Sequence, residues 1–269
     1  MKTRNTPFLL LLLPFFCSAS EDEFYLTGII YPIHDVSLSL AVDGPLAKLM
    51  VKEVDFVEQD QKLLSLDDRL QSLEVERRKS IFEDRSQLIT TEKNLALLKE
   101  LVATKEGLFE STKTVSESEL KRNRIQFNQA EGEYKAYSEL KKREEIEYRI
   151  SQQVLSTYSL LSPIKGQVIE INPEVGEWVK SGDPILRIID SSVCFLDINL
   201  VASQALSINK DKPVKIRILT GNKPITKTGN IQYIAPIADG GSGLVRLKVY
   251  FENNEPKIIP GVTGQLILE

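Results

Sequence analysis

The chain has too few cysteines, histidines and methionines to suggest disulfide bonds or a metal site. Its 269 residues include two cysteines, one histidine, two methionines and one tryptophan. The histidine, His34, stands beside Asp35, and the sequence has no Gly-x-Ser-x-Gly turn that would supply a nucleophile. No spacing of Cys and His matches a metal-ligand motif. We therefore expect no catalytic residue, no bound metal and no cofactor.

The chain also lacks an excess of positive charge. Its formal net charge is -4. Binding to nucleic-acid phosphates requires clustered Lys and Arg, so we expect no nucleic-acid partner.

A long apolar run is missing as well. The longest one, residues 7–16, is shorter than the roughly 20 residues that a membrane-spanning helix needs. Basic residues precede it and small residues follow it (Lys2 and Arg4; Ser18, Ala19 and Ser20). This order predicts a signal peptide over residues 1–20, with cleavage after Ala19 or Ser20, and export of the mature chain.

Cys17 introduces an alternative, because a bacterial lipoprotein carries its lipid on a cysteine at the end of the apolar run. Phe16 stands where lipid processing needs a small residue, so cleavage past Cys17 is the main prediction and lipidation the alternative. Cleavage leaves Cys194 as the remaining cysteine, so no intramolecular disulfide is expected. We expect Cys194 to be a small buried hydrophobic residue.

Short strands separated by turn residues occupy both ends of the mature chain. Residues 36–68 and 159–190 each contain a few short apolar runs, too few to close a core alone. Residues 191–269 contain five or six more strands and predict a small β-barrel, to which residues 21–35 add a strand. Trp178 is expected to fill the core of the paired half-sheets.

Residues 69–158 have no proline and two glycines, and Glu, Lys, Arg, Gln and Leu dominate them. Apolar residues recur every seven positions, and Lys141 is the one interruption (Ile81, Leu88, Leu95, Val102, Phe109; Leu120, Phe127, Tyr134, Tyr148, Leu155). This recurrence predicts an antiparallel coiled-coil hairpin with a narrow seam. Its first helix should run from Arg69 to about Glu110 without a break.

The hairpin should turn at about residues 111–115. Ser116 and Glu119 fit a capping box, in which the Ser116 side chain caps the second helix and the Glu119 side chain returns to the Ser116 backbone. An antiparallel hairpin ends beside its own beginning. Residues 36–68 and 159–190 therefore pair into one lipoyl-like domain that the hairpin interrupts.

This order of segments resembles the periplasmic adaptors, or HlyD-type membrane fusion proteins, of Gram-negative efflux and secretion systems. The best local matches are residues 162–168, 176–179 and 182–186, whereas Val54 and Asp60 stand where the family usually has glycine. The resemblance implies a mixed α and β fold. It consists of a split lipoyl-like β-domain, interrupted by a long antiparallel α-helical coiled-coil hairpin and followed by a small β-barrel. The chain ends just after the last barrel strand, so we expect the family's further membrane-proximal domain to be absent or rudimentary.

The resemblance also implies a function without catalysis. A periplasmic adaptor of this kind bridges an inner-membrane transporter, of the RND or the ABC type, and a TolC-type outer-membrane channel. It would assemble with further copies of itself as a ring, a hexamer by resemblance. Lys105, Phe109 and Ser116 fall where the family tip commonly carries Arg, Leu and Ser, so they are candidate channel contacts.

Two other functions fit part of the pattern. An exported structural spacer would use the rod without any role in transport. A biotin or lipoyl carrier would share the half-sheets, but it presents a lysine on a tight turn where this chain has the hairpin.

Overall fold

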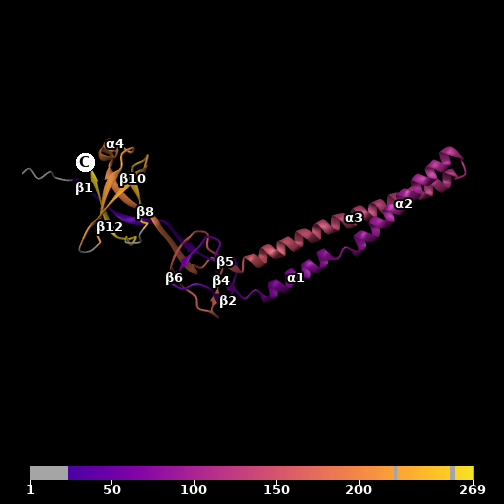
Figure 1. The fold of residues 1–269 in the computed structure, drawn as a ribbon, viewed down its shortest axis with the longest axis horizontal. Helices are drawn as coiled ribbons and strands as arrows, with labels where there is room; N and C mark the ends of the chain where they lie inside the picture. The colour runs from indigo at the N-terminus through magenta and orange to yellow at the C-terminus, as the bar shows by residue number, and fades with distance from the viewer. Residues whose placement is uncertain (1–23, 221–222, 255–257, 269) are drawn as a thin grey trace, which may run out of the picture. The chain divides into compact units, whose positions relative to one another are not determined.

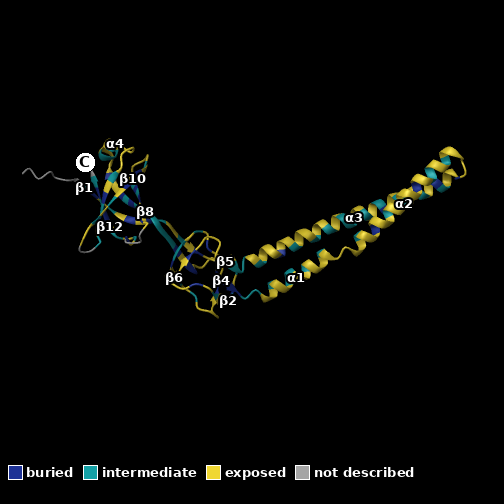
Figure 2. Ribbon diagram, in the orientation of Figure 1, coloured by how far each residue is buried: buried dark blue, intermediate teal, exposed yellow. Residues whose placement is uncertain are grey.

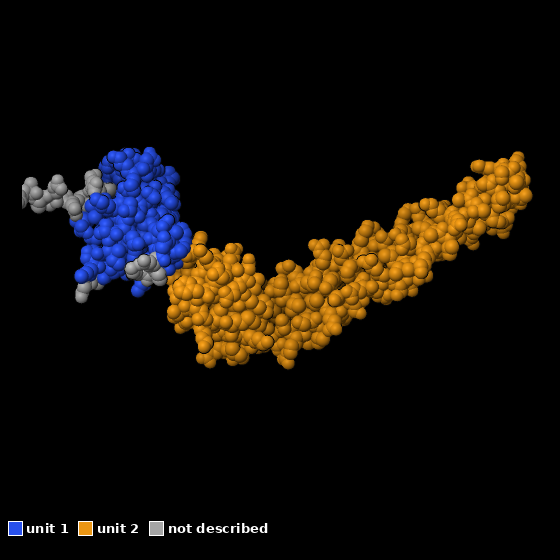
Figure 3. Space-filling view, in the orientation of Figure 1, with its two compact units in different colours: residues 1–33, 191–269 blue, residues 34–190 orange. Residues whose placement is uncertain are grey.

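The chain divides into two compact units (Figure 3). The computed structural model describes residues 24–220, 223–254 and 258–268. The predicted signal peptide, residues 1–20, and Cys17 lie outside these ranges. Unit 1 comprises residues 1–33 and 191–269, and unit 2 comprises residues 34–190. Within the described ranges, no helix is both long and apolar enough to span a membrane.

Unit 1 is a six-stranded β-barrel (Figure 1). Strands follow one another around it in the order β1-β12-β9-β10-β11-β8, and β8 pairs again with β1. Their bounds are β1 Phe24–Leu38, β8 Leu186–Val201, β9 Val214–Ile218, β10 Ile225–Ile234, β11 Leu244–Glu252 and β12 Thr263–Leu268, with a short helix, α4 Ala202–Ser207, after β8. The strands predicted for residues 191–269 are therefore present, and α4 is an addition to them.

Alternation along the barrel strands places one apolar face inward. Buried residues of β8 and β11 such as Leu196, Ile198 and Leu247 alternate with partly exposed ones, as a half-buried strand requires. Cys194 is fully buried in this core, as predicted. At Gly28 a Cβ atom would collide with the backbone carbonyl of Asp197, so a glycine is needed where β1 passes β8.

Unit 2 combines a small β-sandwich with a helical hairpin. The sandwich strands are β2 Gly44–Leu49, β3 Phe56–Val57, β4 Lys62–Leu66, β5 Ser159–Leu161, β6 Gly166–Ile171 and β7 Trp178–Val179, together with parts of β1 and β8. One sheet runs β5-β4-β2-β7, and β6 and β3 continue from β8 in the other. Their apolar faces form one core (Leu38, Leu40, Leu46, Val51, Val57, Leu63, Leu64, Leu66, Leu160, Val168, Val179, Ile185, Leu186, Ile188).

The two halves of this sandwich are copies of one motif. At a constant offset along the chain, Gly44 corresponds to Gly166 and Val57 to Val179, and the strand pairs correspond too. Leu46 pairs with Leu66 as Val168 pairs with Ile188, and β3 pairs with β6 as β7 pairs with β2. Exchanging the halves reproduces the pairing, so an approximate two-fold axis relates them. Neither half closes the core without the other.

The repeat explains the conformation of two residues that replace glycine. Val54 and Asp60 have φ of 75° and 62°, and their counterparts Gly176 and Gly182 have φ of 97° and 84°. The turn geometry is kept because the backbone bonds are kept: Val54 N–H donates to Val168 O at 2.8 Å, and Gly176 N–H donates to Leu46 O at 2.8 Å. Asp tolerates this region of φ, but a β-branched residue is strained there.

Trp178 is not in the core, and that prediction is wrong. Its side chain is 66% exposed, whereas the next residue, Val179, is buried. Successive residues of a strand point to opposite faces, so only one of the two can face the core. The first half repeats this arrangement, with Phe56 74% exposed and Val57 buried.

Replacing Val54 by glycine should stabilise unit 2. The strain of valine at positive φ costs about 1–3 kcal/mol. Glycine removes this strain, but it loses more backbone entropy on folding than valine does, and this loss offsets part of the gain. We expect Val54→Gly to raise the free energy of unfolding by about 1 kcal/mol, measured by urea denaturation. Asp60→Gly is the matched control and should give a clearly smaller gain. Equal gains at both sites would contradict the strain assigned to the valine.

Candidate functional site: the helical hairpin and its tip

Three helices form the hairpin. Helices α1 (Arg69–Glu83) and α2 (Ser86–Ser111) make the first arm, and α3 (Glu117–Ser156) makes the second (Figure 1). Most of their surface is exposed, with few buried positions (Figure 2). The prediction of one continuous helix in the first arm is wrong. Helix α1 ends at Glu83 and α2 begins at Ser86, so Asp84 and Arg85 interrupt the arm.

The break shifts the residues that face the second arm. Counting back in sevens from Leu88 predicts Ile81 in the seam, but Ile81 is exposed and Phe82 faces α3 instead. The Phe82 ring stacks on Tyr148 of α3 at 5.9 Å between centroids. Two non-helical residues change the rotation of the chain, so the repeat on either side of the break is out of phase by one position.

Lys141, the interruption in the seam of α3, lies opposite this break. Its Nζ donates to the backbone O of Ile81 at 2.9 Å and pairs with Glu144 Oε2 at 2.5 Å. Ile81 O lies in the last turn of α1, where carbonyl groups have no partner within the helix. On the other side of the break, Asp84 Oδ1 accepts the N–H of Ser86 at 3.0 Å. Polar groups thus replace the helical bonds that the break removes.

We expect Lys141→Met to loosen the hairpin at the break. Methionine keeps the length of the side chain but leaves Ile81 O and the mostly buried Glu144 without their cation, which costs roughly 2 kcal/mol. Hydrogen exchange at the amides of residues 84–88 should become faster. Lys142→Met is the control, because Lys142 is exposed and pairs with Glu139 on the same helix. Unchanged exchange in Lys141→Met would show that the lysine does not hold the break.

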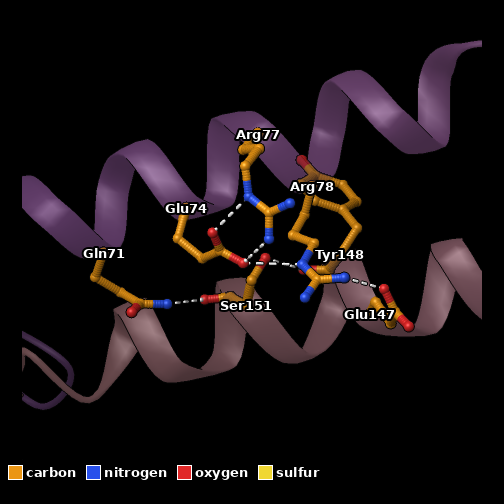
Figure 4. Close-up of polar contacts among 7 residues, drawn as sticks. All are labelled: Gln71, Glu74, Arg77, Arg78, Glu147, Tyr148 and Ser151. Carbon is orange, nitrogen blue, oxygen red and sulfur yellow. Dashed lines mark hydrogen bonds and ion pairs between the residues drawn. The ribbon is translucent and has the colours of Figure 1, made fainter.

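A cluster of charged residues joins the arms near the base of the hairpin (Figure 4). Glu74 accepts hydrogen bonds from Arg77 Nη2 at 2.7 Å and from Arg78 Nε at 2.9 Å. Arg78 also pairs with Glu147 on α3, and Gln71 Nε2 donates to Ser151 O at 3.3 Å. The hydrogen bond from Arg77 and, to a smaller extent, the one from Arg78 lower the pKa of Glu74 to about 2.

This pKa gives the cluster a defined dependence on pH. A glutamate in an unfolded chain titrates near 4.3, so the stabilisation is complete above that pH and is lost as the pH falls toward 2. Carbon-detected NMR should find the Glu74 carboxyl titrating near 2. In an Arg77→Gln, Arg78→Gln variant it should return toward about 4.3. A Glu74 that titrates near 4.3 in the unaltered protein would contradict the cluster.

The tip is a short turn, and ion pairs join the two arms beside it. Helix α2 ends at Ser111 and α3 begins at Glu117, with Lys113 at φ 50° between them. Lys105 Nζ on α2 contacts Glu119 Oε1 on α3 at 2.6 Å, and this hydrogen bond lowers the pKa of Glu119. Beneath the turn, the side chain of Val115 is buried.

Two of the three predicted tip residues, Lys105 and Ser116, contact Glu119. The Ser116 hydroxyl accepts the Glu119 N–H at 3.2 Å, so Ser116 caps α3. The carboxylate that the capping box directs back to Ser116 instead binds Lys105. Phe109 is half-buried on α2. Sequence reasoning missed the pairing of Lys105 with Glu119 and the neighbouring pair of Glu106 with Arg124, at 2.6 Å.

The described residues contain no group of three or more His, Cys, Asp or Glu that could hold a metal ion. A lipoyl-like sandwich split by a long helical hairpin, in a chain that also contains a β-barrel, defines the class of periplasmic adaptors. Residues 34–191 match the family model "RND MFP, barrel-sandwich hybrid domain". This match covers more than half of the chain and coincides with unit 2. The chain belongs to this family, the membrane fusion proteins of efflux systems.

Solved structures share the fold. MacA from Actinobacillus actinomycetemcomitans is 23% identical with a TM-score of 0.76, and the match covers 92% of this chain and 78% of MacA. A MacA–MexA chimera that contains the α-hairpin of Pseudomonas aeruginosa MexA is 20% identical with a TM-score of 0.61, covering 91% and 79%. The membrane fusion protein Spr0693 from Streptococcus pneumoniae R6 is 12% identical with a TM-score of 0.59, covering 91% and 98%. No curated protein matches the sequence.

Proposed function

We propose that this protein is a non-catalytic adaptor that bridges an inner-membrane transporter, of the RND or ABC type, and a TolC-type outer-membrane channel. The observation that carries the proposal is the uninterrupted helix α3, which spans 40 residues and presents a closed turn far from the sandwich within unit 2. At 1.5 Å per residue such a helix is about 60 Å long. The exposed polar surface of the hairpin favours an extended rod over a buried helical bundle, and the family to which the chain belongs favours an adaptor.

Each segment has a role in this proposal. The signal peptide directs the chain to the periplasm, where the barrel with its added β1 strand meets the transporter. The hairpin, residues 69–158, acts as a coiled-coil rod, and Lys105, Phe109 and Ser116 lie at the end that meets the channel. Further copies of the chain complete a ring, a hexamer by analogy with the family.

Site-specific photocrosslinking in the native cell tests the bridge. A crosslinking residue would replace Thr112 in the tip and, in a separate variant, Lys223 in the barrel. We expect mass spectrometry to identify an outer-membrane channel from position 112 and an inner-membrane transporter from position 223. The bridge would be contradicted if neither position crosslinked to a membrane protein while the protein still self-associated. That result would favour the structural spacer.

A charge exchange separates two roles of Lys105. Lys105→Glu should break the pair with Glu119 and reduce crosslinking of position 112 to the channel. Combining it with Glu119→Lys restores the pair in reverse. If Lys105 itself binds the channel, the double variant should stay as weak as Lys105→Glu, which is the result we expect. Full recovery in the double variant would show that the lysine only closes the turn.

A further inference from the structure

One face of α1 lies against α3 in the observed structure. Its residues recur at intervals of four, three and four positions, and each is half-buried (Gln71, Val75, Arg78 and Phe82). Gln71 and Arg78 reach across to α3 (Figure 4), and Phe82 stacks on Tyr148. Phe82 precedes Leu88, the first seam residue of α2, by six positions, so this face is out of phase with the seam of α2.

A second face, one position earlier in the sequence, is in phase with the seam of α2. It consists of four residues at the same intervals (Leu70, Glu74, Arg77 and Ile81). Ile81 precedes Leu88 by seven positions, as Leu88 precedes Leu95. Leu70 and Ile81 are exposed, at 85% and 39%. Each face therefore offers two apolar and two polar residues, and α1 carries two alternative seams of similar apolar content.

One backbone angle separates the two arrangements. Asp84 has φ −71° and ψ 102°, and Arg85 has φ −104° and ψ 10°. A helical residue has φ near −63° and ψ near −42°, so ψ of Asp84 is the angle that departs far from a helix. Its return to a helical value would join α1 to α2. Because a helix has 3.6 residues per turn, a change of phase by one residue turns α1 about its own axis by about 100°.

We propose that the hairpin has a second conformation, in which residues 69–111 form one continuous helix and Leu70 and Ile81 replace Val75 and Phe82 against α3. Two packings of one sequence with similar apolar content can differ by only a few kcal/mol, and such a pair makes a two-state element. The change is confined to the first arm and the turn of Asp84. It is a property of the hairpin alone and does not rest on the proposed bridge.

Lys141 has a partner in both conformations. In the observed one, its Nζ donates to the backbone O of Ile81 at 2.9 Å. In the continuous helix, that oxygen accepts the N–H of Arg85, and Asp84, three residues after Ile81, enters the seam on the side of α3. Lys141 already contributes to the lowered pKa of Asp84, after the larger effect of the hydrogen bonds from Ser86. The carboxylate of Asp84 would then replace the carbonyl of Ile81 as its partner.

Contacts of Phe82 and Asp84 favour the observed conformation. The Phe82 ring stacks on Tyr148 at 5.9 Å, the Arg85 guanidinium lies 6.0 Å from the centroid of the Phe82 ring, and Asp84 Oδ1 accepts the N–H of Ser86 at 3.0 Å. The continuous helix loses these contacts and gains helical hydrogen bonds and the burial of Leu70 and Ile81. We therefore expect it to be the minor conformation, at roughly 0.1–10% of molecules.

NMR on the unaltered full-length protein tests the proposal directly. Relaxation-dispersion and saturation-transfer experiments on residues 70–88 report the population and the chemical shifts of a minor conformation. We expect exchange in this segment, with the ¹³Cα shift of Asp84 in the minor conformation moving to a helical value. The absence of a minor conformation would overturn the proposal. So would a minor conformation with random-coil shifts, because that is local unfolding of α1.

Two neighbouring substitutions should move the population in opposite directions. Phe82→Ala removes a contact of the observed conformation and should raise the ratio of continuous to broken helix by on the order of tenfold. Ile81→Ala removes a contact of the continuous helix and should lower this ratio several-fold. Leu97→Ala, at a 67% exposed position of α2 that belongs to neither seam, is the control and should leave the ratio unchanged. Changes of the same sign in Phe82→Ala and Ile81→Ala would overturn the proposal.

Discussion

The fold of unit 2 depends on one constraint: two half-motifs must pair although the whole hairpin separates them in sequence. Closing a long flexible loop costs entropy, and a helical hairpin reduces that cost because its ends are adjacent once it has formed. Leu66 N–H then donates to Tyr158 O at 2.9 Å, and Lys62 lies opposite Leu161. The sandwich core follows from this closure, since each half supplies only part of it.

The hairpin itself is held by many weak interactions. Its buried positions are few, and exposed ion pairs such as that of Arg124 with Glu106 contribute little individually. Pairs that join the arms still determine their alignment, because they occur at the base, at the break and at the tip. Lys105 and Lys141 illustrate this, since both lie in or beside the seam and both contact the opposite arm. The hairpin has little buried core, so ion pairs between the two arms align its helices, as side-chain packing does in a buried helical bundle.

The sequence allowed the segment order, the strands of the barrel and the two arms to be predicted, because heptad recurrence and turn residues are local signals. The break at Asp84 and Arg85 contains no proline or glycine, so helix propensity did not indicate it. The one sign of the break was Lys141, which interrupts the apolar repeat of the second arm. Its role becomes clear only from the first arm, where it donates a hydrogen bond to the backbone O of Ile81. Trp178 was misplaced because its size suggested the core, whereas alternation within a two-residue strand decides which neighbour is buried. At the tip, Ser116 was recognised as a cap, but the partner of Glu119 lies 14 residues away on the other helix.

The break in the first arm also determines how the rod responds to force. On either side of Asp84 and Arg85 two helices share a load, but at that level α3 alone runs unbroken. A displacement applied at one end would therefore concentrate as curvature over a few residues of one helix. Bending of the hairpin would then be governed by the few residues of α3 beside Lys141 that lie opposite the break.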